Sequence, residues 1–245
     1  EHRVLARSRD PALNGGLPWA NRAQEGDLAP EDTPINANGK HVVIIGGGDT
    51  GADCLGTAHR QGAASVRQFE IMPRPVDGRP TANPWPTYPM SYKVTSAHEE
   101  GGERVYAVNT ERFVVGDDGQ LVGLEYHEVE QKLTDGRMSF ERVEGSDTTL
   151  DVDLVFLAMG FTGPERGPLL DQLGVDLDDR GNVARSSEWA TNVEGVFVAG
   201  DAGRGQSLIV WAIAEGRACA AAVDTFLEGH SDLPAPIVPT DRPLV

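Results

Sequence analysis

The sequence predicts an α/β fold that combines at least one parallel sheet with an antiparallel flap. Three apolar runs, residues 42–45, 154–160 and 195–201, each end in or lead into glycine and are typical of strands buried on both faces. Helix-like segments follow the first and third of these runs. Apolar and polar residues alternate over much of residues 105–153, which predicts antiparallel strands there.

A glycine pattern follows the first apolar run. The run leads directly into Gly46-x-Gly48-x-x-Gly51, and a helix is expected over residues 49–61. Gly46 lets the chain turn tightly out of the strand, and Gly48 lets backbone approach a pyrophosphate. Gly51 lets the helix pack closely on the strand. This strand–turn–helix context predicts a dinucleotide site, with a plain structural turn as the alternative.

The elements after the glycine pattern bear on which dinucleotide is bound. Asp49 or Thr50 can cap the helix, whose free N–H groups then face the phosphates. A second strand is expected over residues 65–72, and its tip meets the adenosine ribose in dinucleotide folds. Glu70 there would accept a hydrogen bond from a 2′-hydroxyl and favour NADH, whereas Arg74 would pair with a 2′-phosphate and favour NADPH. The sequence leaves both open, and both can also be solvated loop residues.

The other elements follow from turn signals and alternation. Residues 1–40 are predicted to form an irregular connecting segment, with one short helix around residues 18–24. Asp117-Asp118-Gly119 predicts the turn of a hairpin. The antiparallel strands expected around and after this turn are residues 105–116, 120–130, 138–144 and 149–153. Later expected elements are a short helix at 169–173, a hairpin-like passage at 175–183 and an irregular tail from His230.

A second candidate site lies near the C-terminus. The third apolar run ends in Gly200-Asp201, and a long alanine-rich helix is expected over residues 207–227. The Asp201 carboxylate could accept hydrogen bonds from hydroxyls such as those of a flavin's ribityl chain. Helix N–H groups from Gln206 to Leu208 could stabilise the negative charge that develops on a reduced flavin. The alternative is an ordinary strand–loop–helix in which Asp201 is a cap.

Composition excludes several classes of partner. The formal net charge of −17 argues against nucleic acid and against an anionic membrane surface. No apolar run is long enough to cross a bilayer, so we expect a cytoplasmic protein. Cys54 and Cys219 lie far apart in helix-like stretches and are expected to be small buried residues, not a disulfide or a metal site.

Several motifs together resemble the NADPH domain and the closing FAD segment of the glutamate synthase small subunit. The likeness extends from about residue 18 to about residue 229. The motifs that carry it, besides the glycine pattern and residues 195–201, are Asp49-Thr50-Gly51-Ala52-Asp53-Cys54, Arg60-Gln61-Gly62-Ala63, Phe69-Glu70-Ile71-Met72-Pro73-Arg74-Pro75, Asn83-Pro84-Trp85-Pro86, Ala97-His98-Glu99-Glu100-Gly101, Leu157-Ala158-Met159-Gly160-Phe161 and Arg204-Gly205-Gln206-Ser207-Leu208-Ile209-Val210-Trp211-Ala212-Ile213.

The resemblance implies a two-dinucleotide-binding-domain flavoprotein. It implies a linker and FAD-domain remnant at 1–40, a Rossmann-like NADPH domain at 41–160 and the C-terminal part of an FAD domain at 161–245. The family's small subunit transfers a hydride from NADPH to FAD. Electrons then pass through iron–sulfur clusters to a large subunit that makes L-glutamate from glutamine and 2-oxoglutarate. No residue is assigned acid or base duty, because hydride transfer between stacked rings depends on positioning.

The resemblance also assigns cofactor-binding residues by position. Those implied for NADPH are Gly46, Gly47, Gly48, Asp49, Thr50, Gly51 and Arg74. Those implied for FAD are Gly200, Asp201, Gln206, Ser207 and Leu208, and Gly160 is included as a further cofactor-binding residue.

The chain departs from the family in two features. It has two cysteines and one Gly-x-Gly-x-x-Gly, whereas family members begin with a cysteine-rich cluster-binding region and a glycine motif for the ADP half of FAD. We therefore expect the C-terminal half of such a subunit, with a half-built FAD site and without clusters. The alternatives are an NADP(H)-binding module without turnover and a related flavin reductase that feeds another acceptor.

Overall fold

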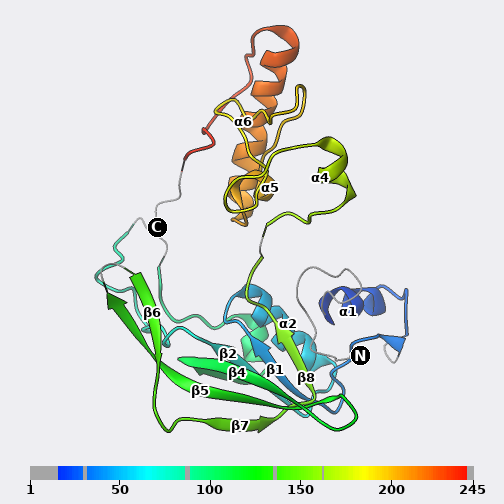
Figure 1. Ribbon diagram of the computed structural model, residues 1–245, viewed down its shortest axis with the longest axis vertical. Helices are drawn as coiled ribbons and strands as arrows, with labels where there is room; N and C mark the ends of the chain where they lie inside the picture. Colours follow the sequence, from blue (N-terminus) through cyan, green and yellow to red (C-terminus); the bar gives the residue numbers. More distant parts are fainter. Residues whose placement is uncertain (1–15, 30–31, 86–88, 135–136, 162, 242–245) are drawn as a thin grey trace. The chain divides into compact units, whose positions relative to one another are not determined.

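The computed structural model describes residues 16–29, 32–85, 89–134, 137–161 and 163–241 (Figure 1). Part of the predicted connecting segment, residues 1–15 and 30–31, lies outside these ranges. The chain divides into two compact units, the first ending at Gly160 and the second beginning at Phe161.

A parallel sheet forms the centre of the first unit. Its strands are β1 (His41–Ile45), β2 (Ser65–Glu70), β3 (Glu103–Tyr106) and β8 (Leu154–Leu157), in the order β3-β2-β1-β8. All three neighbouring pairs are parallel. Helix α2 (Asp49–Arg60) connects β1 to β2, and its C-cap residue is Gln61. The predicted strand–glycine–helix–strand unit is therefore confirmed.

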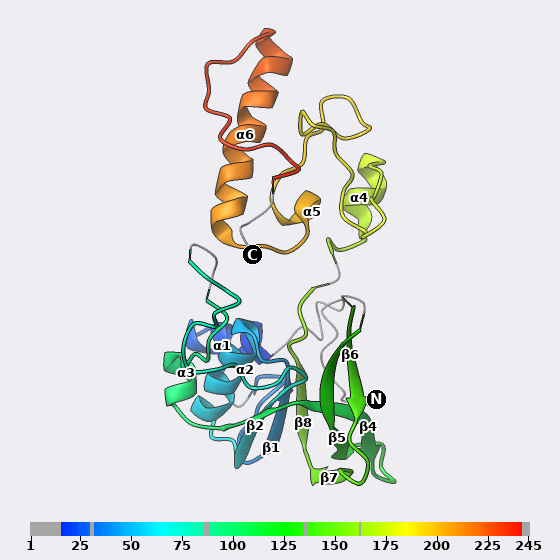
Figure 2. The ribbon, with the colours of Figure 1, turned by 90° about the vertical axis from the view of Figure 1, so that its left-hand side faces the viewer.

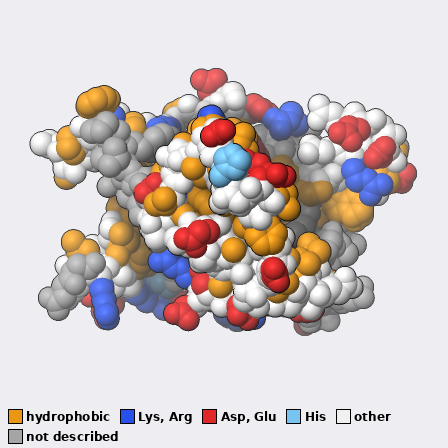
Figure 3. Space-filling model, turned by 90° about the horizontal axis from the view of Figure 1, so that it is seen from above, with side chains coloured by type: hydrophobic (Ala, Val, Ile, Leu, Met, Phe, Trp, Pro, Cys, Tyr) orange, Lys and Arg blue, Asp and Glu red, His pale blue; other side chains and the backbone are white. Residues whose placement is uncertain are grey.

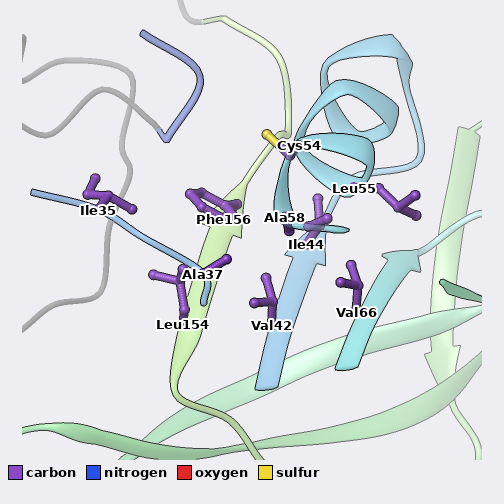
Figure 4. Close-up of a cluster of buried hydrophobic side chains, with 10 residues drawn as sticks. All are labelled: Ile35, Ala37, Val42, Ile44, Cys54, Leu55, Ala58, Val66, Leu154 and Phe156. Atoms are coloured by element: carbon purple, nitrogen blue, oxygen red, sulfur yellow. The ribbon is translucent and has the colours of Figure 1, made fainter. Parts of the chain in front are cut away.

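Helices cover one face of this sheet, as Figure 2 shows for α1 (Gly16–Gln24), α2 and α3 (Ser96–Glu99). Alternate residues of the central strand, Val42 and Ile44, point toward α2, and Leu55 of α2 has no exposed surface. This core buries ten side chains (Figure 4), which are Ile35, Ala37, Val42, Ile44, Cys54, Leu55, Ala58, Val66, Leu154 and Phe156. Burial of this apolar surface fixes where α2 begins relative to the ends of β1 and β2.

An antiparallel layer packs against the other face of the parallel sheet (Figure 2). Its strands are β4 (Val108–Val115), β5 (Leu121–Thr134), β6 (Arg137–Arg142) and β7 (Thr148–Asp151), and the long β5 pairs with the other three. The second core holds side chains from both layers, which are Val43, Phe69, Val108, Leu121, Leu124, Val152 and Val155. The predicted antiparallel flap is confirmed.

The prediction of one continuous strand over residues 105–116 is wrong. Ala107 has a φ of 55° and separates β3 from β4. Its N–H donates to the carbonyl oxygen of Met72, and its own carbonyl accepts from the N–H of Val129. The chain thus passes at Ala107 from the parallel sheet to the antiparallel one, which alternation alone does not reveal.

The second unit is built from helices and irregular loops. Its helices are α4 (Pro168–Leu173), α5 (Asp201–Arg204) and α6 (Ile209–Glu228). A bridge between Leu177 and Val183 matches the expected hairpin-like passage. The tail after α6 is irregular as far as it is described.

The prediction of a third strand over residues 195–201 is wrong. Within the described part of the second unit this segment forms only one bridge, between Phe197 and Ala190, and Asp201 already begins α5. A strand requires a neighbour that continues the ladder, and among the described residues the pairing does not extend beyond this one bridge. The long helix begins at Ile209, two residues later than predicted.

Hydrophobic and acidic side chains are interspersed on the surface seen from above in Figure 3. Among the described residues, no helix combines the length and the apolar character that spanning a membrane requires.

Candidate dinucleotide-binding site

The turn after β1 is held against its neighbours by backbone contacts. Gly46 has a φ of 126°, and a Cβ there would overlap the carbonyl oxygen of Ala158, just after β8. The Gly46 N–H donates to the carbonyl oxygen of Phe69, at 2.8 Å. Only glycine meets both requirements, the left-handed backbone and the close approach.

Gly51 brings the first turn of α2 against this turn. It is buried, and a Cβ on it would overlap the carbonyl oxygen of Gly46 and lie 2.5 Å from Nε2 of Gln68. The helix therefore packs on the strand end at backbone contact distance, as the third glycine of the pattern predicts.

Gly48 differs from the other two glycines of the pattern, Gly46 and Gly51. It is exposed, its φ is −81°, and a Cβ on it would meet no protein atom within 4 Å. Neither backbone conformation nor intramolecular packing requires glycine at this position. A missing Cβ here leaves room for a group from outside the protein to approach the backbone, so the turn fits a pyrophosphate.

The N-terminus of α2 is less capped than predicted. Gly48 is the N-cap residue and no side chain caps the helix, so the expectation that Asp49 or Thr50 caps it is wrong. Asp49 and Thr50 are both exposed as the first residues of the helix. The first-turn N–H groups, which carry the positive end of the helix dipole, thus lack a side-chain acceptor and can face an anion.

Glu70, at the end of β2, is directed toward the protein backbone. Its Oε2 accepts from the N–H of Gly47 at 2.8 Å, and its Oε1 accepts from the N–H of Met72 at 2.9 Å. A Cβ on Gly47 would overlap this carboxylate. Glu70 therefore supports the glycine turn, with one backbone hydrogen bond on each oxygen.

Arg74 lies in a cluster with an aromatic ring and a second arginine. Its guanidinium carbon is 3.9 Å from the ring centroid of Tyr92, and Arg104 lies 4.3 Å from the same centroid. Asp77 pairs with Arg74 at 2.7 Å, and this hydrogen bond is the main reason that the pKa of Arg74 is raised. Two cations on one ring near the tip of β2 are suited to an anionic group.

Sequence reasoning missed Arg104 and Tyr92. Arg104 lies on β3, beside Gln68 of β2. Because residues 105–116 were predicted to belong to an antiparallel strand, nothing placed Arg104 at the dinucleotide edge of the parallel sheet.

The second group of predicted residues lies in the second unit, except Gly160, which ends the first unit with a φ of 83°. The Asp201 carboxylate accepts from the N–H of Ser207 at 3.2 Å and lies 3.3 Å from its hydroxyl oxygen. Gln206 accepts from the N–H of Phe161 at 3.0 Å. These contacts shape the loop between α5 and α6 from within.

The free backbone N–H groups at the start of α6 belong to later residues than predicted. The N-cap of α6 is Leu208, without a side-chain cap, so its first-turn N–H groups begin at Ile209 and not at Gln206. The N–H of Ser207 is already bound to Asp201. The expectation that Gln206 to Leu208 supply the helix amides is therefore wrong by a few residues.

A buried charge cluster that the sequence did not reveal supports Gly200. Glu215 of α6 has no exposed surface, and its carboxylate accepts from Arg185 at 2.8 and 2.9 Å and from Arg204 at 2.5 Å. It also accepts from the N–H of Gly200 at 2.8 Å, where φ is 68°. Burial alone would raise the pKa of Glu215, but the hydrogen bonds from the arginines and Gly200 outweigh it and lower the pKa.

Both cysteines are free thiols, one in each unit. Burial, with a smaller contribution from Asp53, raises the pKa of Cys54 to about 12. Burial also raises the pKa of Cys219. Neither is poised as a thiolate nucleophile at neutral pH.

Comparison with known proteins matches the chain to a family. The model of the pyridine nucleotide-disulphide oxidoreductases matches residues 6–216. The glutamate synthase (NADPH) small chain of Mycobacterium tuberculosis is 66% identical over 231 residues, which are 93% of this chain and 46% of the relative. That of Bacillus subtilis is 44% identical over 82% of this chain and 42% of its own length. The predicted resemblance is confirmed, and the chain spans less than half the length of these relatives.

Solved structures show the same fold. The thioredoxin reductase of T. acidophilum is 25% identical, with a TM-score of 0.52 over 78% of this chain and 53% of its own. FprA of Mycobacterium tuberculosis, solved in complex with NADPH, is 14% identical, with a TM-score of 0.54 over 81% of this chain and 54% of its own. These likenesses confirm the predicted class of α/β flavoprotein fold.

We expect Glu215→Gln to destabilise the second unit by about 3–5 kcal/mol, because Arg185 and Arg204 would remain buried without a counter-charge. Hydrogen exchange of the α6 amides measures this free energy of opening. Since the folded pKa lies below the ordinary 4.5, the wild-type contribution is present above pH 4.5 and is lost as the pH falls further.

Glu228→Gln, an exposed change on the same helix, is the control and should alter the opening free energy by less than about 0.5 kcal/mol. Equal exchange in the two variants would mean that the cluster does not stabilise the unit.

Proposed function

We propose, from the premise that this chain belongs to the pyridine nucleotide-disulphide oxidoreductase family, that its first unit binds the pyrophosphate of NADPH at the turn from Gly46 to Gly51. The observation that carries this proposal is Gly48, whose missing side chain serves no contact within the protein. Gly48 would let the phosphates approach the backbone, and Asp49 and Thr50 would offer the uncapped amides of α2. Gly46, Gly47 and Gly51 would hold the turn in the shape that receives them.

The choice of NADPH over NADH rests on the tip of β2. The Glu70 carboxylate already accepts two backbone hydrogen bonds. Arg74 and Arg104, both against Tyr92, offer guanidinium groups that can pair with a 2′-phosphate. Of the two alternatives that the sequence left open, this arrangement favours NADPH.

The second unit is proposed to contribute part of an FAD site, with residues 161–245 as the C-terminal part of that domain and 41–160 as the NADPH domain. Gly200, Asp201, Gln206, Ser207 and Leu208 are its candidate residues. Gly160, at the end of the first unit, is proposed only as a further cofactor-binding residue. The uncapped N-terminus of α6 and the Gly200 turn held by Glu215 support this assignment. Bound NADPH supplies a hydride, and bound FAD accepts it. The chain's own contribution is to hold the two cofactors, and no side chain of the site needs to transfer a proton.

For the whole protein we propose the electron-input part of an NADPH-dependent glutamate synthase. The 66% identity to a glutamate synthase small chain supports this activity. The partner of this protein would be a large subunit that makes L-glutamate from glutamine and 2-oxoglutarate. The protein would be located in the cytoplasm. An NADP(H)-binding module without turnover and a flavin reductase feeding another acceptor are the competing functions.

The visible spectrum of the purified chain, followed by titration with NADPH, tests the proposal. A flavin band that bleaches with NADPH supports the reductase, and glutamate formed on adding large subunit, glutamine and 2-oxoglutarate identifies the acceptor. A colourless chain that binds NADPH would favour the binding module. Bleaching without glutamate would favour another acceptor.

The glycine turn gives a specific prediction. Gly48→Ala should raise the dissociation constant for NADPH roughly tenfold or more, because the new methyl group occupies space reserved for the pyrophosphate. The free energy of unfolding should change by less than about 0.5 kcal/mol, since the position is open and its φ is ordinary. Fluorescence titration and urea unfolding measure the two effects.

Gly167→Ala is the matched control, because Gly167 is the N-cap of α4 and is equally open. If both variants bind NADPH like the wild type, the pyrophosphate does not lie on this turn.

Arg74 gives a prediction about cofactor choice. Arg74→Ala should weaken binding of NADPH roughly 10- to 100-fold through loss of a charge-assisted hydrogen bond, and leave NADH nearly unchanged. Arg112→Ala, which removes an exposed arginine paired with Glu125 on the flap, should change neither. Equal losses for both nucleotides would contradict the role of Arg74.

A further inference from the structure

Gln68 is a buried side chain that joins the glycine turn to a more distant helix. It lies on β2 with 1% of its surface exposed. Its Nε2 donates to the carbonyl oxygen of Gly46 at 2.9 Å and lies close beneath Gly51. The amide group thus fixes the direction of the Gly46 carbonyl, at the start of the turn that contains Gly48.

His98 binds the other end of this amide. Because Nε2 of Gln68 donates to a carbonyl, its Oε1 is an acceptor, and it lies 3.1 Å from Nε2 of His98. The imidazole must therefore carry a hydrogen on Nε2. An amide flip of Gln68 cannot replace this contact, since it would set Oε1 against the Gly46 carbonyl oxygen.

Thr95 fixes the state of the other imidazole nitrogen. The backbone N–H of Thr95 donates to Nδ1 of His98 at 3.2 Å, and the Thr95 hydroxyl lies 2.9 Å from the same atom. A nitrogen that accepts from a backbone N–H has no hydrogen of its own. Both nitrogens are thus assigned, and the network from Thr95 to Gly46 forms only with neutral His98.

The surroundings of His98 are set by three elements. It lies on α3, which packs beside α2 on the helical face of the sheet (Figure 2). Burial is the main cause of a lowered pKa for His98, Arg104 of β3 lowers it further, and Asp49 of α2 raises it. On the neighbouring part of the chain, Glu100 pairs with Arg60 of α2.

We propose that His98 is a positioning residue for the dinucleotide site: neutral His98 holds Gln68 against the Gly46 carbonyl, and its protonation releases the turn and weakens binding of a pyrophosphate. This inference rests on the proposed function of that turn. A hydrogen on Nδ1 would face the N–H of Thr95, donor against donor, and would find its acceptor in the Thr95 hydroxyl. The ring must therefore turn toward that hydroxyl, which weakens its contact with Gln68. The motif Ala97-His98-Glu99-Glu100-Gly101 thereby acts on the site without touching the ligand.

The direction of the pH effect follows from the state of the imidazole. Affinity should be constant above the ordinary histidine pKa of 6.5 and fall as the pH drops below it. Loss of the hydrogen bond predicts roughly a two- to tenfold weaker dissociation constant at acid pH. ADP-ribose is the probe, because it has the pyrophosphate but lacks the 2′-phosphate, whose own ionisation would change in this range.

The experiment compares binding of ADP-ribose by calorimetry between pH 7.5 and pH 5 for four forms of the full chain. The wild type should weaken as the pH falls. His98→Gln, which can still donate to Gln68, should bind like the wild type at pH 7.5 and lose the pH dependence. Gln68→Met should bind weakly at all pH values. His230→Gln, an exposed change in the tail, should keep the wild-type profile.

NMR of the imidazole nitrogens gives a second readout that does not depend on binding. The signals missing from His98→Gln identify His98, and they should show hydrogen on Nε2 at pH 7.5. Hydrogen on Nδ1, or a His98→Gln profile that superimposes on the wild type, would overturn the inference. If the wild type binds neither ADP-ribose nor NADPH at pH 7.5, the proposed function itself fails.

Discussion

The close contact of three backbone segments around the glycine turn is the constraint on which the first unit depends. Gly46 touches the chain just after β8, and Gly51 touches Gly46 itself, so that neither position has room for a Cβ. This contact sets where α2 begins over the ends of the strands, and thus where its uncapped N–H groups point. The core between α2 and the sheet stabilises the arrangement, since Leu55 and Ile44 are fully buried there.

Local patterns predicted the elements whose shape is encoded locally. The apolar run before Gly46, the helix after it and the hairpin at 117–119 all follow from composition and turn chemistry, and all are found. The assignment of residues 103–106 was missed because it depends on a partner, β2, and on the left-handed conformation of Ala107. The prediction of a strand at 195–201 failed for the converse reason: in the part of the chain that the structure describes, its apolar sequence has only one bridge partner, Ala190.

The site shows the same division between what the chain encodes locally and what it does not. The glycine spacing predicted that Gly46 and Gly51 must lack a side chain, because that requirement is steric. It did not predict that Glu70 turns to the amides of Gly47 and Met72, because this direction is decided by two backbone groups from different segments. Likewise, Glu215 reads as one polar residue in an alanine-rich helix, and its burial is explained only by Arg185 and Arg204, which lie outside that helix.

Both units hold a glycine turn by a side chain from a neighbouring element. Gln68 binds the carbonyl of Gly46, Glu70 binds the amide of Gly47, and Glu215 binds the amide of Gly200. Glycine loses more conformational freedom on ordering than any other residue. If a glycine-rich turn became ordered only when its ligand bound, the entropy lost in ordering it would weaken the affinity. Side chains that satisfy the inward-facing backbone groups remove that cost before the ligand arrives. The exposed backbone groups of the turn are then held in one geometry before binding, so that a ligand can take the place of the water bound to them.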